Sequence, residues 1–213
     1  MKILFFGDSI TDAGRKREEL TGELQELGAG YVRVIGERFA KERPDDTVIN
    51  QGISGNRVVD LYARAKPDVW NLQPDVLSIL IGINDVWHDI DRQCGVELDR
   101  FEKVYRMLIE ETKERLPNSR IIVLEPFVLR ASATKETAEQ PDRFKRFEQV
   151  YEYAKVVKTL ANEYGLSFVA LQEKLTAGAL KDGAEAYLGD GVHPSEGGAK
   201  LIAEEWMKVF ATK

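Results

Sequence analysis

The chain has 213 residues, of which 43% are apolar and 31% are charged, and its net charge at pH 7 is −6. This composition is typical of a folded globular protein and argues against disorder. The charge is spread over segments of mixed sign without a basic run, so a nucleic-acid partner is not expected. We expect residues 1–213 to form a single domain, because no Pro-, Gly- or Ser-rich linker divides them.

The sequence predicts a cytoplasmic protein that does not insert into a membrane. No apolar segment approaches the length of a membrane span, and the N-terminal apolar run is too short for the core of a signal peptide. Cys94 is the only cysteine, which excludes an internal disulfide and is compatible with a reducing compartment. Two histidines and one cysteine without ligand spacing predict no metal site, and no organic cofactor is expected.

Short β-rich runs alternate with longer amphipathic stretches along the chain. We predict strands at residues 3–6, 47–50, 76–81, 120–124 and 167–170. We predict helices at residues 31–41, 97–115, 144–164 and 195–211, where apolar residues recur at spacings of three and four. This alternation predicts an α/β fold in which helices cover both faces of a parallel sheet of about five strands.

Polar, glycine-containing segments follow the first three predicted strands. Gly7-Asp8-Ser9-Ile10 follows the first, Gly52-Ile53-Ser54-Gly55-Asn56 the second, and Gly82-Ile83-Asn84-Asp85 the third. Ligand sites in open parallel sheets gather at the carboxyl ends of the strands, so we expect these three loops to meet at one edge. Asp190-Gly191-Val192-His193, before the last predicted helix, can reach the same edge.

These segments contain the groups that a serine hydrolase needs. Ser9 is the candidate nucleophile, His193 the candidate base, and Asp190, three residues earlier, the carboxylate that orients the base. The backbone N–H groups of Ser9 and Gly55 and the side-chain amide of Asn84 are candidate donors to a developing oxyanion. Each segment alone is explained equally well as a turn or a helix cap, but their joint placement at strand ends favours catalysis.

The base can be chosen between two histidines, His88 and His193. We favour His193, because it has an orienting acid in its own loop. We expect kcat/KM to rise as His193 loses its proton, near pH ~6.5 in a mild environment. Thr11 occupies the position of the last glycine in the Gly-x-Ser-x-Gly elbow of α/β-hydrolases, so that particular fold is not expected.

The four segments, in this order, resemble the four sequence blocks of the SGNH/GDSL hydrolase superfamily, and the resemblance extends over residues 2–211. It implies a three-layer α/β/α, flavodoxin-like fold and an esterase, lysophospholipase, thioesterase or acetylhydrolase activity. It also implies Ser9 as nucleophile and His193 as base with Asp190 as its partner. Gly55 and Asn84 are, by the same resemblance, oxyanion donors.

A narrower resemblance, to the intracellular acetylxylan esterases of this superfamily, is carried by residues 7–12, 51–56 and 82–87. It implies removal of acetyl groups from a small acetylated saccharide, such as a xylo-oligosaccharide, and in some members assembly into a homo-oligomer. Two positions depart from the pattern: His88 stands where arginine is expected, and Gly189 where an aromatic residue is expected.

Four further residues are candidates for binding the substrate, namely Asp8, Asn56, Asp85 and Trp87. Asp85 could instead brace a loop. Trp87 could stack on a sugar ring, or pack in the interior or at a subunit interface.

Two other functions stay open. A lipid or thioester acylhydrolase of the same superfamily needs an extended apolar groove, whereas residues 128–146 read as a polar, charged excursion that forms a lid, a pocket wall or a subunit contact. This modestly favours a small acyl group. A non-catalytic carbohydrate-binding protein is the alternative outside catalysis, and the intact set of triad and donor residues argues against it.

Overall fold

The structure is a computed structural model that describes residues 1–17 and 23–212. Residues 18–22 and 213 of the expected single domain lie outside this description. Five parallel strands form one sheet in the order β2-β1-β3-β4-β5. They are β1 (Lys2–Gly7), β2 (Thr47–Gly52), β3 (Val76–Leu80), β4 (Arg120–Leu124) and β5 (Ser167–Val169). Each differs from its predicted run by at most two residues at either end, so the predicted parallel sheet is confirmed.

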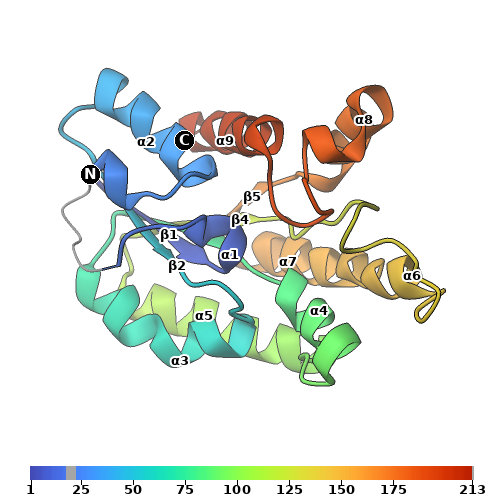
Figure 1. The fold of residues 1–213 in the computed structure, drawn as a ribbon. Helices are drawn as coiled ribbons and strands as arrows, with labels where there is room; N and C mark the ends of the chain where they lie inside the picture. Colours follow the sequence, from blue (N-terminus) through green and yellow to red (C-terminus); the bar gives the residue numbers. More distant parts are fainter. Residues whose placement is uncertain (18–22, 213) are drawn as a thin grey trace.

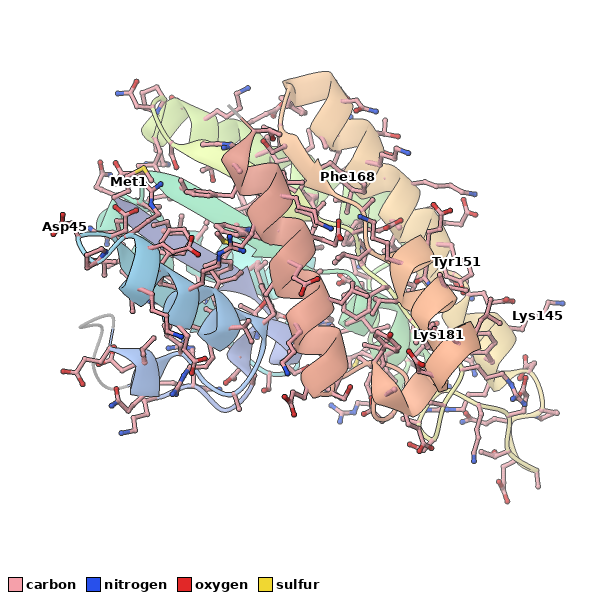
Figure 2. All side chains as sticks on the ribbon, turned by 90° about the horizontal axis from the view of Figure 1, so that it is seen from above. Met1, Asp45, Lys145, Tyr151, Phe168 and Lys181 are labelled. Carbon is pink, nitrogen blue, oxygen red and sulfur yellow. The ribbon has the colours of Figure 1, made fainter. Side chains whose placement is uncertain are left out.

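Helices cover both faces of this sheet (Figure 1). Helices α2 (Tyr31–Glu42) and α9 (Glu196–Ala211) pack against each other on one face, and Figure 2 shows them side by side across the sheet. Helices α3 (Val58–Asp68), α5 (Leu98–Arg115) and α7 (Val150–Tyr164) cover the other face. Every residue of β3 is buried, as a strand covered on both sides requires. The expected three-layer α/β/α architecture is confirmed.

Trp206 of α9 connects the last helix to the middle of the sheet. Its side chain is fully buried, its ring centroid lies 5.0 Å from that of Phe5 in β1, and its indole N–H donates to Ser78 Oγ of β3 at 2.9 Å. A buried indole is expected to find such a partner. The contact fixes α9 on the sheet, and with it the loop that precedes α9 and carries His193.

Two helix predictions differ from the structure. The predicted helix at residues 144–164 is divided into α6 (Arg143–Phe147) and α7. Glu148 and Gln149 between them keep right-handed helical backbone angles, and Gln149 N–H donates to the carbonyl of Arg146, three residues back. The amphipathic pattern therefore runs through a tightened turn that periodicity alone does not reveal.

The segment at residues 82–85, predicted as a loop, contains the start of α4 (Ile83–Arg92). Ile83, Val86 and Ile90 form the buried side of this helix at spacings of three and four. The remaining helical elements are α1 (Ser9–Asp12), α8 (Gln172–Asp182), and the 3₁₀ turns at Leu24–Glu26, Trp70–Leu72 and Ala184–Ala186.

The register of the central strands aligns their carboxyl ends. Gly7 of β1 pairs with Gly52 of β2 on one side and with Leu80 of β3 on the other. The three segments that follow these residues therefore start side by side at one edge of the sheet. Residues 128–146 approach the loop that carries His193, because Leu129 N–H donates to the carbonyl of Gly191 and Ala133 N–H to that of Asp190. Figure 2 shows Lys145 of this segment on the other side of the molecule from Met1.

Within residues 1–17 and 23–212, no helix is both long and apolar enough to cross a membrane. In the same ranges, no group of three or more His, Cys, Asp or Glu side chains is arranged to hold a metal ion.

Candidate active site

Ser9, His193 and Asp190 form a hydrogen-bonded chain. Ser9 is the first residue of α1, two positions after the end of β1. Its Oγ lies 2.9 Å from His193 Nε2, although 184 positions separate the two residues. His193 Nδ1 lies 2.7 Å from Asp190 Oδ2. Asp190 Oδ1 accepts the backbone N–H groups of Val192 and His193, both at 2.8 Å. With Nδ1–H donating to Asp190, Nε2 is free to accept the Ser9 proton.

The same contacts shift the ionisation of both partners. Burial alone would raise the pKa of Asp190, but the hydrogen bonds from His193 and the backbone N–H of Val192 lower it to about 2. The hydrogen bond to Asp190 raises the pKa of His193, and this outweighs the opposing effect of burial. The imidazole therefore titrates above its ordinary value, which corrects the expectation based on a mild environment.

A pocket of about 340 Å³ opens beside Ser9. It is lined by Ser9, Ser54, Gly55, Asn84, Trp87, His88, Asp91, Arg92 and His193. The three expected oxyanion donors, Ser9, Gly55 and Asn84, therefore share one cavity with the histidine.

Each expected oxyanion donor has an N–H that no hydrogen bond among the described residues uses. Within the described residues, no hydrogen bond uses the backbone N–H of Ser9 or of Gly55. Gly55 has φ +83°, a conformation that costs glycine little and other residues more. Asn84 Nδ2 donates to the carbonyl of Asn56 at 3.0 Å, which orients the amide and leaves its second N–H available.

Of the four further substrate-binding candidates, Trp87 lines the pocket. Its ring centroid lies 5.9 Å from that of His193, and its N–H donates to Asp91 Oδ2 at 2.7 Å. Asn56 lies outside the lining and is engaged within the protein, because its carbonyl accepts from Asn84 and its Oδ1 accepts from Arg64. Asn56 therefore supports Asn84 and Arg64 in this structure, and its contact with substrate stays a prediction.

Asp8 and Asp85 have no exposed surface, so the expectation that they contact substrate is corrected. Asp85 Oδ1 accepts Val58 N–H at 3.0 Å and so braces the start of α3; burial raises the pKa of Asp85 to about 8 despite this bond. Asp8 Oδ1 accepts Ile10 N–H at 2.9 Å and caps α1. Burial likewise raises the pKa of Asp8 to about 7.

His88 lines the pocket, but in the described part of the chain no hydrogen bond joins its ring to Ser9 or to a carboxylate. Burial, together with the charges of Arg92 and Arg57, lowers the pKa of His88. Asp91 and Arg92 were missed as pocket residues because α4 itself was not predicted. The apolar spacing of three and four along residues 83–90 is the signal that could have found them.

Residues 128–146 support the site from outside the pocket. Leu129 N–H donates to the carbonyl of Gly191, next to Asp190, at 2.8 Å. Arg143 Nη1 lies 2.6 Å from Asp91 Oδ1 on α4. This segment therefore ties the histidine loop to the opposite pocket wall.

The chain belongs to the GDSL-like Lipase/Acylhydrolase family, which matches residues 5–201, so the expected superfamily is confirmed. It is 39% identical over 214 residues to an acetylxylan esterase from Geobacillus stearothermophilus, with 97% of this chain and 92% of that protein covered. The crystal structure of Axe2, an acetylxylan esterase from the same organism, has a TM-score of 0.86 and 35% identity, covering 100% of this chain and 94% of that one. A multidomain esterase from Ruminococcus flavefaciens is 24% identical over 98% of this chain and 28% of its own length.

Solved structures of Axe2 include three catalytic mutants, in which a serine, an aspartate or a histidine is replaced by alanine. Each has a TM-score of 0.86 and 34% identity to this chain. The aspartate and the histidine are three positions apart in that protein.

Proposed function

We propose that this protein is a serine esterase that removes O-acetyl groups from acetylated xylo-oligosaccharides. The single observation that carries the proposal is the chain of contacts from Ser9 Oγ to His193 Nε2 and from His193 Nδ1 to Asp190 Oδ2. The separation of Asp190 and His193 matches that of the aspartate and histidine replaced in the catalytic mutants of Axe2. The acetylxylan substrate is carried over from that relative.

Acylation begins when His193 Nε2 takes the proton of Ser9 Oγ and the oxygen attacks the acetyl carbonyl carbon. The carbonyl oxygen becomes negatively charged and accepts hydrogen bonds from the N–H groups of Ser9, Gly55 and Asn84. Asp190 stabilises the imidazolium that forms. His193 then protonates the departing sugar oxygen, the C–O bond breaks, and an acetyl-enzyme remains.

Deacylation repeats these steps with water as the nucleophile. His193 removes a proton from water, the hydroxyl adds to the acetyl carbon, and the Ser9 Oγ–carbon bond breaks as Oγ regains a proton. Acetate leaves and the free serine returns. All proton transfers use side chains of this chain, and the reaction needs no added cofactor.

The lining of the pocket supports a small acyl group on a polar alcohol. Most of its lining residues are polar or charged, and Trp87 offers an aromatic face. A sugar ring stacks on such a face while its hydroxyl groups bind the polar neighbours. A long acyl chain would instead require an extended apolar lining.

Acetate release tests the proposal directly. Wild type, Ser9→Ala and Ser119→Ala are assayed on acetylated xylo-oligosaccharides, p-nitrophenyl acetate and p-nitrophenyl octanoate. Ser119 is a matched control, because its hydroxyl has no hydrogen-bond partner among the described residues and the residue directly precedes β4. We expect sugar deacetylation in wild type and Ser119→Ala, none in Ser9→Ala, and poor octanoate turnover.

Other results would redirect the assignment. Ser9-dependent octanoate hydrolysis without sugar deacetylation would make the protein a lipid or thioester acylhydrolase. Activity of Ser9→Ala equal to that of wild type would refute the serine mechanism.

We also propose that the chain acts as one catalytic domain in the cytoplasm. A single hydrophobic core that runs from Ile3 to Trp206 supports one domain, and the sole cysteine, Cys94, suits a reducing compartment. One cooperative unfolding transition and recovery of activity in the cytoplasmic fraction would be the expected results. Light scattering on the purified protein determines whether it forms a homo-oligomer.

A further inference from the structure

Arg64, on α3, binds two parts of the candidate site that are distant in sequence. Its side chain is only 13% exposed, and its guanidinium carbon lies 4.3 Å from the centre of the Phe6 ring. Nε donates to Asn56 Oδ1 at 2.7 Å, and Nη2 donates to the carbonyl of Gly7 at 3.0 Å. Nη1 lies 2.7 Å from Asp68 Oδ2, one helical turn further along α3.

Two of these acceptors, Gly7 and Asn56, belong to the segments that carry the nucleophile and the oxyanion donors. Gly7 is the last residue of β1 and stands two positions before Ser9. Asn56 follows Gly55, and its carbonyl accepts the Asn84 amide at 3.0 Å. A single guanidinium therefore connects the chain that carries the nucleophile with the loop that carries one oxyanion donor and orients another.

We propose that Arg64 is a positioning residue that fixes the distance between Ser9 Oγ and the oxyanion donors Gly55 and Asn84. The inference rests on the proposed serine esterase function. Arginine suits this task because its planar guanidinium offers donors in fixed directions, which a lysine ammonium does not. Oxyanion donors act only when they are placed within tenths of an ångström of the charge that develops, so a small shift of Asn56 weakens catalysis.

The oxyanion loop has an independent anchor, so loss of Arg64 leaves the fold in place. Asp12 Oδ2 accepts Ser54 N–H at 2.9 Å and the Ser54 hydroxyl at 3.1 Å. Asp85 holds the backbone of Val58 on the other side of the loop. The start of the loop is also held to β1 and α1, because Ile53 N–H donates to the carbonyl of Gly7 at 3.0 Å and Asp12 belongs to the same helix as Ser9. Among the hydrogen bonds of the described residues, Arg64 adds the side-chain link that joins Gly7 to Asn56, at the far end of the loop.

The test uses Arg64→Met, which keeps an apolar stem near Phe6 and removes every guanidinium donor. Arg120→Met is the matched control, because Arg120 also donates to two backbone carbonyls, those of Val209 and Phe210, but from the start of β4 at the opposite edge of the sheet. The kcat and KM for p-nitrophenyl acetate and the Tm are measured for both variants and for Ser9→Ala.

We expect kcat of Arg64→Met to fall by about 10- to 100-fold with KM little changed, as when a catalytic group is displaced without loss of substrate binding. Arg120→Met lowers the Tm and leaves kcat of the folded enzyme unchanged. Arg64→Lys, which keeps the charge and reaches fewer acceptors, gives an intermediate kcat.

A double-mutant cycle with Asn56→Ala separates positioning from general destabilisation. If Arg64 acts through Asn56, both single variants lower kcat and the double variant falls no further than about the larger single effect. Wild-type kcat in Asn56→Ala, or in folded Arg64→Met, would overturn the proposal while an inactive Ser9→Ala leaves the esterase assignment standing. An active Ser9→Ala would remove both. If Arg64→Met fails to fold, Arg64→Lys and Asn56→Ala still decide the question.

Discussion

Replacing Asp190 by asparagine should disable the enzyme through the tautomer of His193. In the wild type, Asp190 Oδ1 accepts two backbone N–H groups at 2.8 Å, while Oδ2 faces His193 Nδ1 at 2.7 Å. The asparagine oxygen must take the Oδ1 position, because an NH₂ group there would face two donors. The amide nitrogen then points at Nδ1 and donates to it. The imidazole proton moves to Nε2, which can no longer accept the proton of Ser9.

The expected loss is about 10⁴-fold in kcat, which corresponds to ~5 kcal/mol of transition-state stabilisation. The assay is p-nitrophenyl acetate hydrolysis, with the Tm as a check on folding. Asp190→Ala is the matched comparison, because it removes the carboxylate without forcing a donor against Nδ1. We expect the asparagine variant to be no more active than the alanine variant, although asparagine is closer to aspartate in shape. A folded Asp190→Asn enzyme with more than about a tenth of the wild-type kcat would refute the tautomer argument.

Three further predictions follow from the geometry. The contact with Asp190 raises the pKa of His193, and only the neutral imidazole acts as base. We therefore expect kcat/KM to fall on acidification with a midpoint above pH 6.5. A midpoint below pH 6.5 would contradict the ion pair. Burial raises the pKa of Asp85 from 3.8 to about 8, so between these two pH values the carboxyl ionises more readily in the unfolded chain and the wild type loses stability as pH rises. Measured by urea unfolding, the stability of Asp85→Asn relative to wild type should therefore increase with pH up to about 8. A difference that does not change with pH would contradict a buried acid. A Cβ on Gly52 would stand 2.2 Å from Asp12 N, so Gly52→Ala should lower the free energy of unfolding by about 3 kcal/mol. A Cβ on Gly189 would meet no atom within 4 Å, so the control Gly189→Ala should change this free energy by less than about 0.5 kcal/mol.

The sheet could be predicted well because its strands are buried on both faces. Runs such as residues 3–6 and 120–124 contain consecutive apolar residues, and polar residues mark where each run ends. The order of the catalytic segments along the chain then placed Ser9, Gly55 and Asn84 at one edge. The pairing of Gly7 with Gly52 and Leu80 is the physical reason that this inference succeeded.

Helix α4 escaped prediction because two of its buried residues are polar. Asn84 and Asp85 sit in its first turn after Gly82, a combination that is typical of a loop. Both are buried because they hold neighbouring segments: Asn84 donates to Asn56, and Asp85 accepts from Val58. Helix propensity and periodicity carry no information about such partners, which become neighbours only after the chain has folded.

The positioning role of Arg64 could not be predicted from the sequence for the same reason. Two of its acceptors, Gly7 and Asn56, lie 57 and 8 positions away, and nothing local distinguishes this arginine from the other charged residues of α3. Residues 128–146 are a similar case. Their polar composition suggested a lid or a wall, whereas their backbone contacts with the histidine loop emerge only from the tertiary structure.

The separation of 184 positions between Ser9 and His193 also affects when the enzyme becomes active during synthesis and folding. The ribosome synthesises Ser9 184 residues before His193, so the nascent chain carries a serine without its base throughout that part of synthesis. Hydrolysis begins only when α9 docks through Trp206 and brings the imidazole to the first strand. Recovery of activity during refolding therefore reports formation of contacts between distant parts of the chain, and it should lag behind formation of the individual helices.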